Sequence, residues 1–439
     1  MGIKVVKFGG TSMADARAIT QSANIVLSDK KRRYVVVSAP GKRDSHDHKV
    51  TDLLYACYHD IEINGECKAT FNKIRERFTQ IVDDLELDFD INPYLDQTEK
   101  DIMKYRNAGF CASRGEYLSA LVFSKKLGYE FIDAKELFVF TENGEFDSEA
   151  TNQKVSKALK HVERAVIPGF YGADEMGNVH TFSRGGSDVS GAVIARAVGA
   201  SMYENWTDVS GFLKADPRIV EKPEPIEILS YRELRELSYM GANVLHPESI
   251  FPVRASNIPI NIRNTFAPDD KGTLIVSEVP DNKVSESIIT GIAGKKGYSI
   301  VFIEKSMMNA ELGFARRVLS VFEYYNVSFE HMPSGIDTVS VVVADNELAG
   351  KEDVIIDRIK KTVNPDHIEI KTGVSLIATV GHGMSYNPGT AAKLCSALAE
   401  NKINIRMIDQ GSSELNIIVG VATNDYEKAI NAIYQAFHK

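Results

Sequence analysis

Short apolar runs alternate with stretches of helical periodicity through the first half of the chain. The runs at Ile3–Phe8 and Tyr34–Val37 are nearly continuous, which is typical of strands buried on both faces. Helical patterns cover Ala14–Leu27 and dominate from Thr51 to about Leu127. The alternation predicts an α/β fold whose mostly parallel sheet is covered by helices on both faces.

Shorter elements continue this alternation. Ser12 is placed to cap the first helix, with Asp15 three residues on, and Ser230–Glu233 forms a capping-box pattern that opens a helix ending near Gly241. A further strand is expected at Ile258–Ile262. Other short apolar segments are expected to be strands or helices at 131–132, 155–159, 165–166, 179–182, 192–198 and 201–204.

The second half of the chain contains an internal repeat, which follows polar stretches at 267–272 and 280–283 that indicate a domain boundary. A shift of 76 residues superimposes three pairs of glycines: Gly297 on Gly373, Gly313 on Gly389 and Gly335 on Gly411. Each copy predicts strand, loop, helix, strand, turn and strand, with second strands at Val327–Phe329 and Ile403–Ile405. Since units of ~70 residues are small for independent folding, we expect both copies to share one sheet.

Composition narrows the classes of function. A length of 439 residues suggests about three domains. The formal net charge of −9 argues against nucleic acid as the main partner. No apolar run has the length of a membrane helix, no signal peptide is evident, and the four cysteines show no paired spacing, so we expect a cytoplasmic protein with reduced thiols. The motifs of P-loop NTPases, dinucleotide dehydrogenases, zinc hydrolases and protein kinases are absent.

The segment Lys7–Ser12 (KFGGTS) predicts an anion site. A lysine at the end of a strand, two glycines and the start of a helix bring positive charge and free backbone N–H groups to one place. The alternative is an ordinary strand–turn–helix connection with an extended lysine. The segment Phe182–Asp188 (FSRGGSD) repeats the arrangement, and Arg184 can bind a carboxylate or phosphate with two parallel hydrogen bonds. There, Asp188 could instead be a simple helix cap.

A third segment, Trp206–Arg218, mixes polar groups with apolar walls as a nucleotide pocket does, although a turn-rich loop has the same composition. With this segment in view, the motifs KFGGTS, SRGGSD, WTDVSG and GANVLHP together resemble the aspartokinases of the amino-acid kinase superfamily, and the repeat resembles their paired ACT regulatory domains. The chain ends soon after the second repeat, which resembles monofunctional members without a fused homoserine dehydrogenase.

The resemblance implies a carbamate kinase-like α/β/α sandwich followed by two ferredoxin-like α+β ACT domains. It implies a catalytic domain over 1–285 and ACT domains over 286–370 and 371–439, with the terminal strand and helix able to complete the first ACT domain. The implied activity is ATP-dependent phosphorylation of the β-carboxylate of L-aspartate, the committed step toward lysine, threonine and methionine. Mg²⁺ is expected to arrive on the ATP phosphates rather than in a protein metal site.

The resemblance also implies roles for individual residues. Lys7, Arg184 and Asp188 would be catalytic, with Lys7 on the transferring phosphoryl group and Asp188 organising Lys7 and the phosphates. The aspartate would be bound by Glu116 at its ammonium, by Arg184 at its α-carboxylate, and by Ser38, Thr51 and Ser187. The implied ATP-binding residues are Lys7, Gly9, Gly10, Ser12, Thr207, Asp208, Phe212, Lys214, Asp216 and Arg218.

Two features depart from the family pattern. Asn243 stands where the family usually has a lysine, so either Lys214 or Arg218 compensates or that contact is dispensable here. The segment between Ser38 and Thr51 is long and polar. Its residues 46–48 (HDH) could suggest a metal site, but we favour a solvated loop.

The repeat is expected to sense an amino acid, lysine rather than threonine, and to join subunits into a homodimer or a dimer of dimers. Glu330 favours lysine because a carboxylate can pair with its ammonium; the alternative is that these positions only build a subunit interface. The implied effector residues are Met308, Gly313, Phe314, Ala315, Ser328, Phe329 and Glu330. Two other functions stay open: a different carboxylate kinase of the superfamily, or a non-catalytic amino-acid sensor with a kinase fold.

Overall fold

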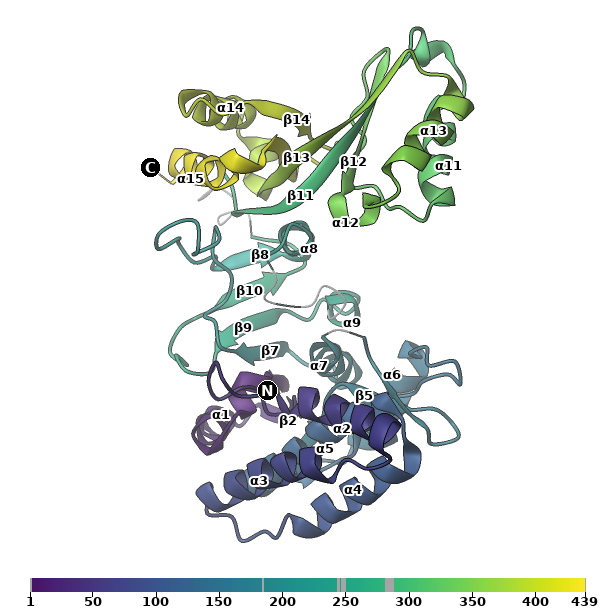
Figure 1. Ribbon diagram of the computed structural model, residues 1–439. Helices are drawn as coiled ribbons and strands as arrows, with labels where there is room; N and C mark the ends of the chain where they lie inside the picture. Colours follow the sequence, from purple (N-terminus) through teal and green to yellow (C-terminus); the bar gives the residue numbers. More distant parts are fainter. Residues whose placement is uncertain (1, 184, 243–244, 246–249, 281–287, 439) are drawn as a thin grey trace. The chain divides into compact units, whose positions relative to one another are not determined.

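The computed structural model describes residues 2–183, 185–242, 245, 250–280 and 288–438 of the chain, and Figure 1 shows the arrangement of its elements. The chain forms two compact units. The first comprises Met1–Phe212, Pro225–Leu234 and Asn243–Val279, and the second comprises Leu213–Glu224, Arg235–Ala242 and Pro280–Lys439. The sequence pattern predicted the change of unit near residue 280, but not that 213–224 and 235–242 join the second unit.

The first unit is built on an eight-stranded sheet with the strand order β3-β4-β2-β1-β7-β9-β10-β8. All neighbouring pairs are parallel except β9 and β10, which confirms the predicted mostly parallel α/β fold. The strands are β1 (Lys4–Phe8), β2 (Arg32–Val37), β3 (Glu130–Phe131), β4 (Ala165–Pro168), β7 (Met202–Thr207), β8 (Ile228–Ser230), β9 (Ile260–Asn264) and β10 (Thr273–Val276).

Helices pack on both faces of this sheet, as alternate side chains of β7 show. Glu204 and Trp206 face a core formed largely with α1, α2, α3 and α5, whereas Tyr203 and Asn205 reach Asp188 on α7. The helices of the first unit are α1 (Ala16–Ser28), α2 (Val50–Asn64), α3 (Lys68–Asp84), α4 (Asn92–Tyr105), α5 (Ala108–Leu127), α6 (Ser148–Leu159), α7 (Gly186–Ala197) and α9 (Ile250–Arg254), with short 3-10 turns at Gly10–Met13 and Ala134–Glu136.

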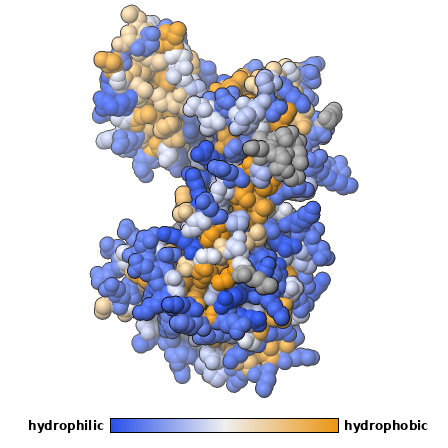
Figure 2. All heavy atoms as spheres, turned by 180° about the vertical axis from the view of Figure 1, so that it is seen from behind, coloured by the Kyte–Doolittle hydropathy of each residue, from blue (hydrophilic) through white to orange (hydrophobic). Residues whose placement is uncertain are grey.

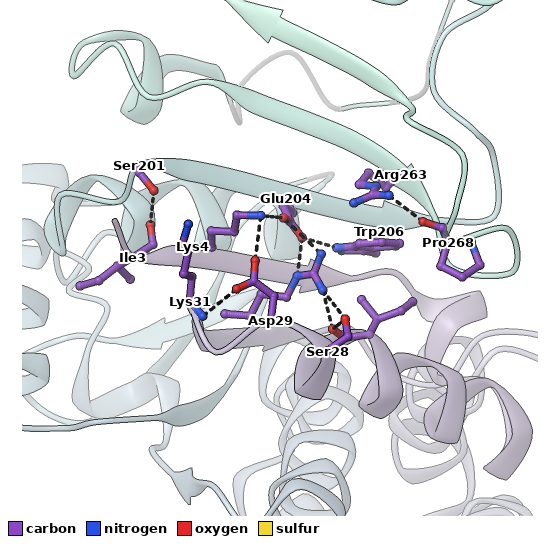
Figure 3. A network of polar contacts seen from close by, with 12 residues as sticks. Ile3, Lys4, Ser28, Asp29, Lys31, Ser201, Glu204, Trp206, Arg263 and Pro268 are labelled. Atoms are coloured by element: carbon purple, nitrogen blue, oxygen red, sulfur yellow. Dashed lines mark hydrogen bonds and ion pairs between the residues drawn. The ribbon is translucent and has the colours of Figure 1, made fainter. Parts of the chain in front are cut away.

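A buried group of charges joins β1, β2 and β7 (Figure 3). Glu204 is almost fully buried, and it accepts hydrogen bonds from Lys4, Arg32 and the indole N–H of Trp206 at 2.8, 2.8 and 2.9 Å. The guanidinium groups of Arg32 and Arg263 lie over the Trp206 ring. Because a buried carboxylate is stable only when it is paired, these cations hold the pKa of Glu204 below its usual value.

One of two strands in a small separate sheet was predicted: β6 (Val179–Thr181) lies within the segment expected at 179–182. It pairs antiparallel with β5 (Tyr171–Ala173), which was not predicted. The pair β8 and β10 at the edge of the main sheet was not predicted either. The predicted capping box is confirmed: the Glu233 carboxylate accepts hydrogen bonds from the backbone N–H and the hydroxyl of Ser230, and α8 (Tyr231–Tyr239) follows. No helix in the described part of the chain is long and apolar enough to cross a membrane.

The second unit is built on a five-stranded antiparallel sheet with the order β12-β11-β13-β15-β14, so the two repeats do share one sheet. Its strands are β11 (Gly291–Glu304), β12 (Thr338–Ala344), β13 (His367–Val380), β14 (Ile405–Asp409) and β15 (Asn416–Ala422). Its helices are α11 (Phe314–Tyr324), α12 (Asp345–Leu348), α13 (Glu352–Val363), α14 (Thr390–Glu400) and α15 (Tyr426–Phe437), with 3-10 turns at Met308–Ala310, His382–Tyr386 and Thr423–Asp425.

Backbone conformation at two of the three glycine pairs confirms the predicted repeat. Gly297 and Gly373 both have positive φ, and so do Gly313 and Gly389, each of which caps the helix that follows it. One expectation is wrong: Val327–Phe329 is not a strand, although the second repeat has β14 near the corresponding position. Residues 331 and 334 make only isolated bridges to β12, and the intervening Pro333 has no N–H to donate to a sheet.

Two segments that precede residue 280 also belong to this unit. In the segment 213–224, Ala215 and Val220 enter the core of the second repeat, and the backbone N–H of Glu224 donates to the Tyr434 hydroxyl on α15. In the segment 235–242, Glu236 accepts a hydrogen bond from the side chain of Asn416 at 2.6 Å. Long-range contacts of this kind leave no periodic signal in the sequence.

Candidate functional site

The adjacent ends of β1 and β7 place a lysine against an aspartate. Lys7 pairs in register with Asn205, and both side chains face α7. The Lys7 ammonium lies 2.6 Å from Asp188 Oδ1, and the Asn205 amide donates to the same oxygen at 3.0 Å. Lys7 is only 8% exposed, a position that an ammonium tolerates because it is paired. The predicted contact between Lys7 and Asp188 is therefore present, at the strand ends where α/β sheets bind ligands.

Of the two glycines after β1, Gly9 borders open space beside Lys7 and Gly10 is closely packed. A side chain at Gly9 would begin 3.7 Å from the Lys7 ammonium and 3.9 Å from the Thr207 hydroxyl, and would fill the space between them. A Cβ at Gly10 would lie 3.1 Å from the carbonyl oxygen of Ala39. These glycines leave room beside Lys7 for a ligand atom, as a phosphate-binding turn requires.

Ser12 does not have the expected capping role. The residues after Gly9 form a 3-10 turn, and α1 begins at Ala16 with Asp15 as its cap, accepting from the N–H of Ala18. The Ser12 side chain is fully buried, and its hydroxyl shares a hydrogen bond of 2.8 Å with that of Thr265. Ser12 thus supports the turn from inside the protein, and its predicted contact with ATP remains a prediction.

The second glycine turn opens α7. Gly185 has a φ of 72° and caps the helix without a side-chain hydrogen bond, so Asp188 is not the cap, and its carboxylate is used on Lys7 and Asn205 instead. A Cβ at Gly186 would lie 2.7 Å from the ring of Phe170, so this turn also needs glycine for close packing. Arg184, expected here to bind the substrate α-carboxylate, lies outside the described residues.

Glu116 is a buried carboxyl group that forms no ion pair with any described residue. It lies in the middle of α5, is 5% exposed, and accepts a hydrogen bond from the backbone N–H of Ala39. Its Oε2 atom has no hydrogen-bond partner among the described residues. Burial raises its pKa to about 8, although the positive charges of Arg114 and Lys7 act in the opposite direction. A buried, unsatisfied carboxyl group of this kind is a candidate receptor for a cationic ligand group.

A cavity of about 1800 Å³ opens beside the start of α7. Thr51 lines the cavity. So do Ser183 and Gly185, which precede and follow position 184 in the sequence, and the aromatic rings of Phe170 and Phe182. Of the other predicted substrate residues, Ser38 donates its backbone N–H to the carbonyl of Phe8. Ser187 is buried against Gly169, where a Cβ would lie 2.7 Å from the serine side chain.

Phe170 is a cavity residue that the sequence analysis missed. Its φ is 78°, a conformation that is strained for an aromatic residue, and its backbone N–H donates to the Ser190 hydroxyl on α7. Strained backbone persists only where the surroundings hold it, and such residues cluster at ligand sites. In the sequence Phe170 is one apolar residue among several, so no pattern marks it.

The predicted nucleotide-binding residues fall on both units. In the first unit, Thr207 ends β7 and its hydroxyl donates to Asp208 at 3.2 Å. Phe212 is 1% exposed, so it belongs to the core and does not form the expected pocket wall; an aromatic side chain gains more from burial than from a solvated site. In the second unit, the predicted residues form ion pairs, Lys214 with Glu224 at 2.7 Å and Arg218 with Asp216 at 2.6 Å. Asn243 lies outside the described residues.

The predicted effector residues lie in two segments of the first repeat, one at the start of α11 and the other, residues 328–330, between α11 and β12. Met308 and Phe314 are buried, Ala315, Ser328 and Phe329 are exposed, and Gly313 caps the helix with a φ of 74°. Glu330 donates its backbone N–H to Val342 on β12, and its carboxylate accepts a hydrogen bond from the hydroxyl of Tyr239, the last residue of α8. The Tyr239 contact was not predicted.

The polar loop before α2 is held by one carboxylate. His46 is exposed, but the side chain of Asp47 is largely buried between Arg43, at 3.0 Å, and Arg77, at 2.6 Å. The expectation of a solvated loop therefore holds for His46 and is wrong for Asp47. No group of three or more metal-binding side chains is gathered in the described parts of the chain.

Models of two known protein families match this chain. The model of the amino acid kinase family matches residues 2–264, and an ACT domain model matches residues 377–437. The chain is 35% identical to aspartokinase 3 of Bacillus subtilis over 99% of this chain and 98% of that protein. It is 32% identical to the chloroplastic bifunctional aspartokinase/homoserine dehydrogenase 2 of Zea mays and spans 50% of that protein's length.

Solved structures match over the whole chain. The crystal structure of Clostridium acetobutylicum aspartate kinase has a TM-score of 0.90 and 51% identity, with both chains fully covered. Escherichia coli aspartokinase III in complex with aspartate and ADP has a TM-score of 0.77 and 25% identity, and its complex with lysine and aspartate has a TM-score of 0.75 and the same identity, again with full coverage.

Proposed function

The chain belongs to the amino acid kinase family and, within it, to the aspartokinases, and from this we propose that it transfers the γ-phosphoryl group of ATP to the β-carboxylate of L-aspartate. The product is 4-phospho-L-aspartate, and the reaction is the committed step toward lysine, threonine and methionine. One observation supports this most strongly: an unsatisfied, buried Glu116 lies within the electrostatic reach of Lys7.

The chemistry of the substrate fits these two charges. The β-carboxylate of aspartate has an ordinary pKa near ~3.9, so it is already ionised at neutral pH and needs no general base. The barrier comes from bringing this anion to a polyanionic phosphate, so catalysis depends on positioning and charge neutralisation. Glu116 receives the substrate ammonium, and Lys7 neutralises the phosphoryl oxygens while Asp188 and Asn205 fix its position.

The remaining roles are part of the same proposal. Arg184 binds the α-carboxylate, and Ser38, Thr51 and Ser187 complete the aspartate site. The phosphates of ATP lie against Gly9 and Gly10, whose missing side chains leave space beside Lys7. Thr207, Asp208, Lys214, Asp216 and Arg218 contact the rest of the nucleotide. Mg²⁺ neutralises the phosphates and arrives bound to them, as is general for ATP in kinases.

The activity is tested by measuring ADP release with aspartate, with glutamate, and with no acceptor. We expect release that depends on aspartate and exceeds the rate with glutamate by at least tenfold. Equal rates with glutamate would identify a different carboxylate kinase. No release with any acceptor, while calorimetry still shows binding of an amino acid, would identify a non-catalytic sensor.

Regulation by an amino acid, lysine in preference to threonine, is the second part of the proposal. Its support is the carboxylate of Glu330, in the segment between α11 and β12, where a ligand ammonium could pair with it. Escherichia coli aspartokinase III has been solved with lysine bound. The other effector residues are Met308, Gly313, Phe314, Ala315, Ser328 and Phe329.

Replacing Glu330 by Gln tests this assignment. The amide keeps the size of the side chain but cannot form an ion pair with the lysine ammonium, so we expect the concentration of lysine that halves the rate to rise at least tenfold. The measurement is a lysine titration of the ADP assay for wild type and for Glu330→Gln. The control is Glu347→Gln, which removes a carboxylate on α12. Unchanged inhibition in Glu330→Gln would contradict the assignment.

We also propose the domain bounds, the oligomeric state and the cellular location of the protein. The kinase domain spans 1–285 and the ACT domains span 286–370 and 371–439, with the terminal strand and helix able to complete the first. A homodimer or dimer of dimers forms through the repeat, which is supported by the exposed apolar residues Leu312 and Ile336 and by the apolar surface of the first repeat (Figure 2). A cytoplasmic location fits four cysteines that are all free.

A further inference from the structure

Two turns meet at the proposed active site without a side chain between them. The turn after β1 carries Gly9 and Gly10, and the segment after β2 runs from Ser38 to Lys49 and leads to Thr51. The N–H of Gly41 donates to the carbonyl of Gly10 at 2.8 Å. A Cβ at Gly41 would lie only 2.7 Å from the carbonyl carbon of Gly10, so the two backbones are in direct contact. In the proposed function, the first turn binds the phosphoryl donor and the second binds the acceptor.

The guanidinium of Arg77 reaches both turns from α3. Its Nε and Nη2 atoms donate to the carbonyl of Ala14, at the end of the phosphate turn, at 3.2 and 2.9 Å. Nη2 also donates to the carbonyl of Gly41 at 2.7 Å, and Nη1 donates to Asp47 at 2.6 Å. One planar group on α3 therefore ties the end of the phosphate turn to two points of the acceptor segment.

The burial of Arg77 argues against a purely space-filling role. The residue is 6% exposed, and burying a guanidinium costs free energy that an apolar side chain of similar size would not cost. Asp47 offsets this cost as the counter-ion and is itself held by Arg43, which donates from its backbone N–H and from its side chain. These two arginines hold the pKa of Asp47 well below its usual value, so the counter-ion is charged at neutral pH.

We propose that Arg77 is a positioning residue that sets the distance between the phosphate turn and the acceptor segment, and so between the two reacting groups. The inference rests on the proposed function but concerns a residue that touches neither substrate. Phosphoryl transfer needs the donor and acceptor aligned, and a displacement of about 1 Å can cost about a hundredfold in rate. Arg77 thus acts on kcat through the relative placement of two backbones.

The test compares Arg77→Ala with Arg75→Ala. Arg75 lies on the same helix, but the ion pairs that it forms with described residues are to Asp96 and Glu99, at 2.8 and 2.9 Å, so its removal controls for the loss of an arginine from α3. We expect kcat to fall at least tenfold in Arg77→Ala and to change less than twofold in Arg75→Ala. If Arg77→Ala does not fold, Arg77→Lys replaces it, since lysine keeps the charge but lacks the three separate donor nitrogens with which the guanidinium reaches Ala14, Gly41 and Asp47; the same fall in kcat is expected.

Chemical rescue separates positioning from general stability. A cavity of about 390 Å³ lined by Arg43, Arg77 and Gln80 lies next to the guanidinium and gives small molecules access. We expect methylguanidinium to restore kcat of Arg77→Ala at concentrations that leave its unfolding temperature unchanged, and methylammonium not to restore it. A kcat within twofold of wild type in Arg77→Ala, or equal rescue by methylammonium, would overturn the proposal.

Hydrogen exchange tests the same claim without turnover. Peptides covering 9–15 and 38–49 should exchange at least tenfold faster in Arg77→Ala than in wild type, and at the wild-type rate in Arg75→Ala. Unchanged exchange in both segments would overturn the positioning role. If wild type and Arg75→Ala release no ADP with aspartate, the proposed function fails, whereas the exchange result still decides whether Arg77 joins the two turns.

Discussion

Replacing Lys7 by Met should lower kcat about a thousandfold while the protein stays folded. Methionine keeps most of the length and apolar contacts of the lysine stem but removes the ammonium, which lies 2.6 Å from Asp188 and beside the space that Gly9 leaves open. A preorganised cation at a transferring phosphoryl group contributes about 10³-fold or more, because it neutralises charge without the cost of reorganising solvent. The measurement is kcat in the ADP assay at saturating aspartate and ATP.

The control for this variant is Lys4→Met. Lys4 lies on the same strand, but its ammonium pairs with Asp29 and Glu204 at 3.1 and 2.8 Å, within the network of Figure 3. We expect Lys4→Met to lower the unfolding temperature and to keep kcat within about threefold of wild type. A Lys7→Met enzyme with more than a tenth of the wild-type kcat would contradict the proposed role of Lys7.

The second large effect concerns Glu116 and pH. Burial raises the pKa of this carboxyl to about 8 in the protein without substrate, so it is mostly protonated at pH 6 and must lose its proton to bind an ammonium. We therefore expect kcat/KM for aspartate to rise nearly tenfold from pH 6 to pH 7 and to level off above pH 8. Values of kcat at saturating aspartate should change little over this range, because the bound ammonium keeps Glu116 ionised.

Glu116→Gln should abolish this pH dependence and lower kcat/KM for aspartate at least a hundredfold at pH 8. The folding stability of the wild type should fall as pH rises, whereas its kcat/KM for aspartate rises. In the unfolded chain Glu116 ionises at its usual pKa near ~4.3, whereas in the folded protein it keeps its proton up to about 8, so the wild type loses stability as pH rises between these values. Thermal unfolding at pH 8 should therefore show a higher midpoint for the Gln variant. A wild-type pH profile that is flat between 6 and 8 would contradict this assignment.

The sequence predicted those strands and turns whose conformation depends on residues that are consecutive in the chain. The buried strands at Ile3–Phe8 and Tyr34–Val37 and the glycine turns that follow β1 and precede α7 were visible, since each is defined by consecutive residues. The repeat was visible because glycines with positive φ recur at corresponding positions, such as Gly313 and Gly389. Strands of three or four residues, such as β8 and β10, carry too few residues for a periodic signal.

The features that were missed depend on contacts between distant residues. Arg77 lies 63 positions from Ala14 and 36 from Gly41, and its sequence context on α3 is that of an ordinary amphipathic helix. Ser12 was misassigned as a cap because a serine before a helix usually caps it, whereas a 3-10 turn here moves the start of α1 to Ala16. The strained φ of Phe170 depends on its packing against α7.

The central claim is that one site holds aspartate by its ammonium and presents its β-carboxylate to the phosphoryl group beside Lys7. The most direct test is to run the reaction with hydroxylamine, which traps an acyl phosphate as a hydroxamate, and to identify the product by mass spectrometry and NMR. We expect aspartyl β-hydroxamate, formed in step with ADP release and lost in Lys7→Met. Formation of the α-hydroxamate, or ADP release without any hydroxamate, would contradict it.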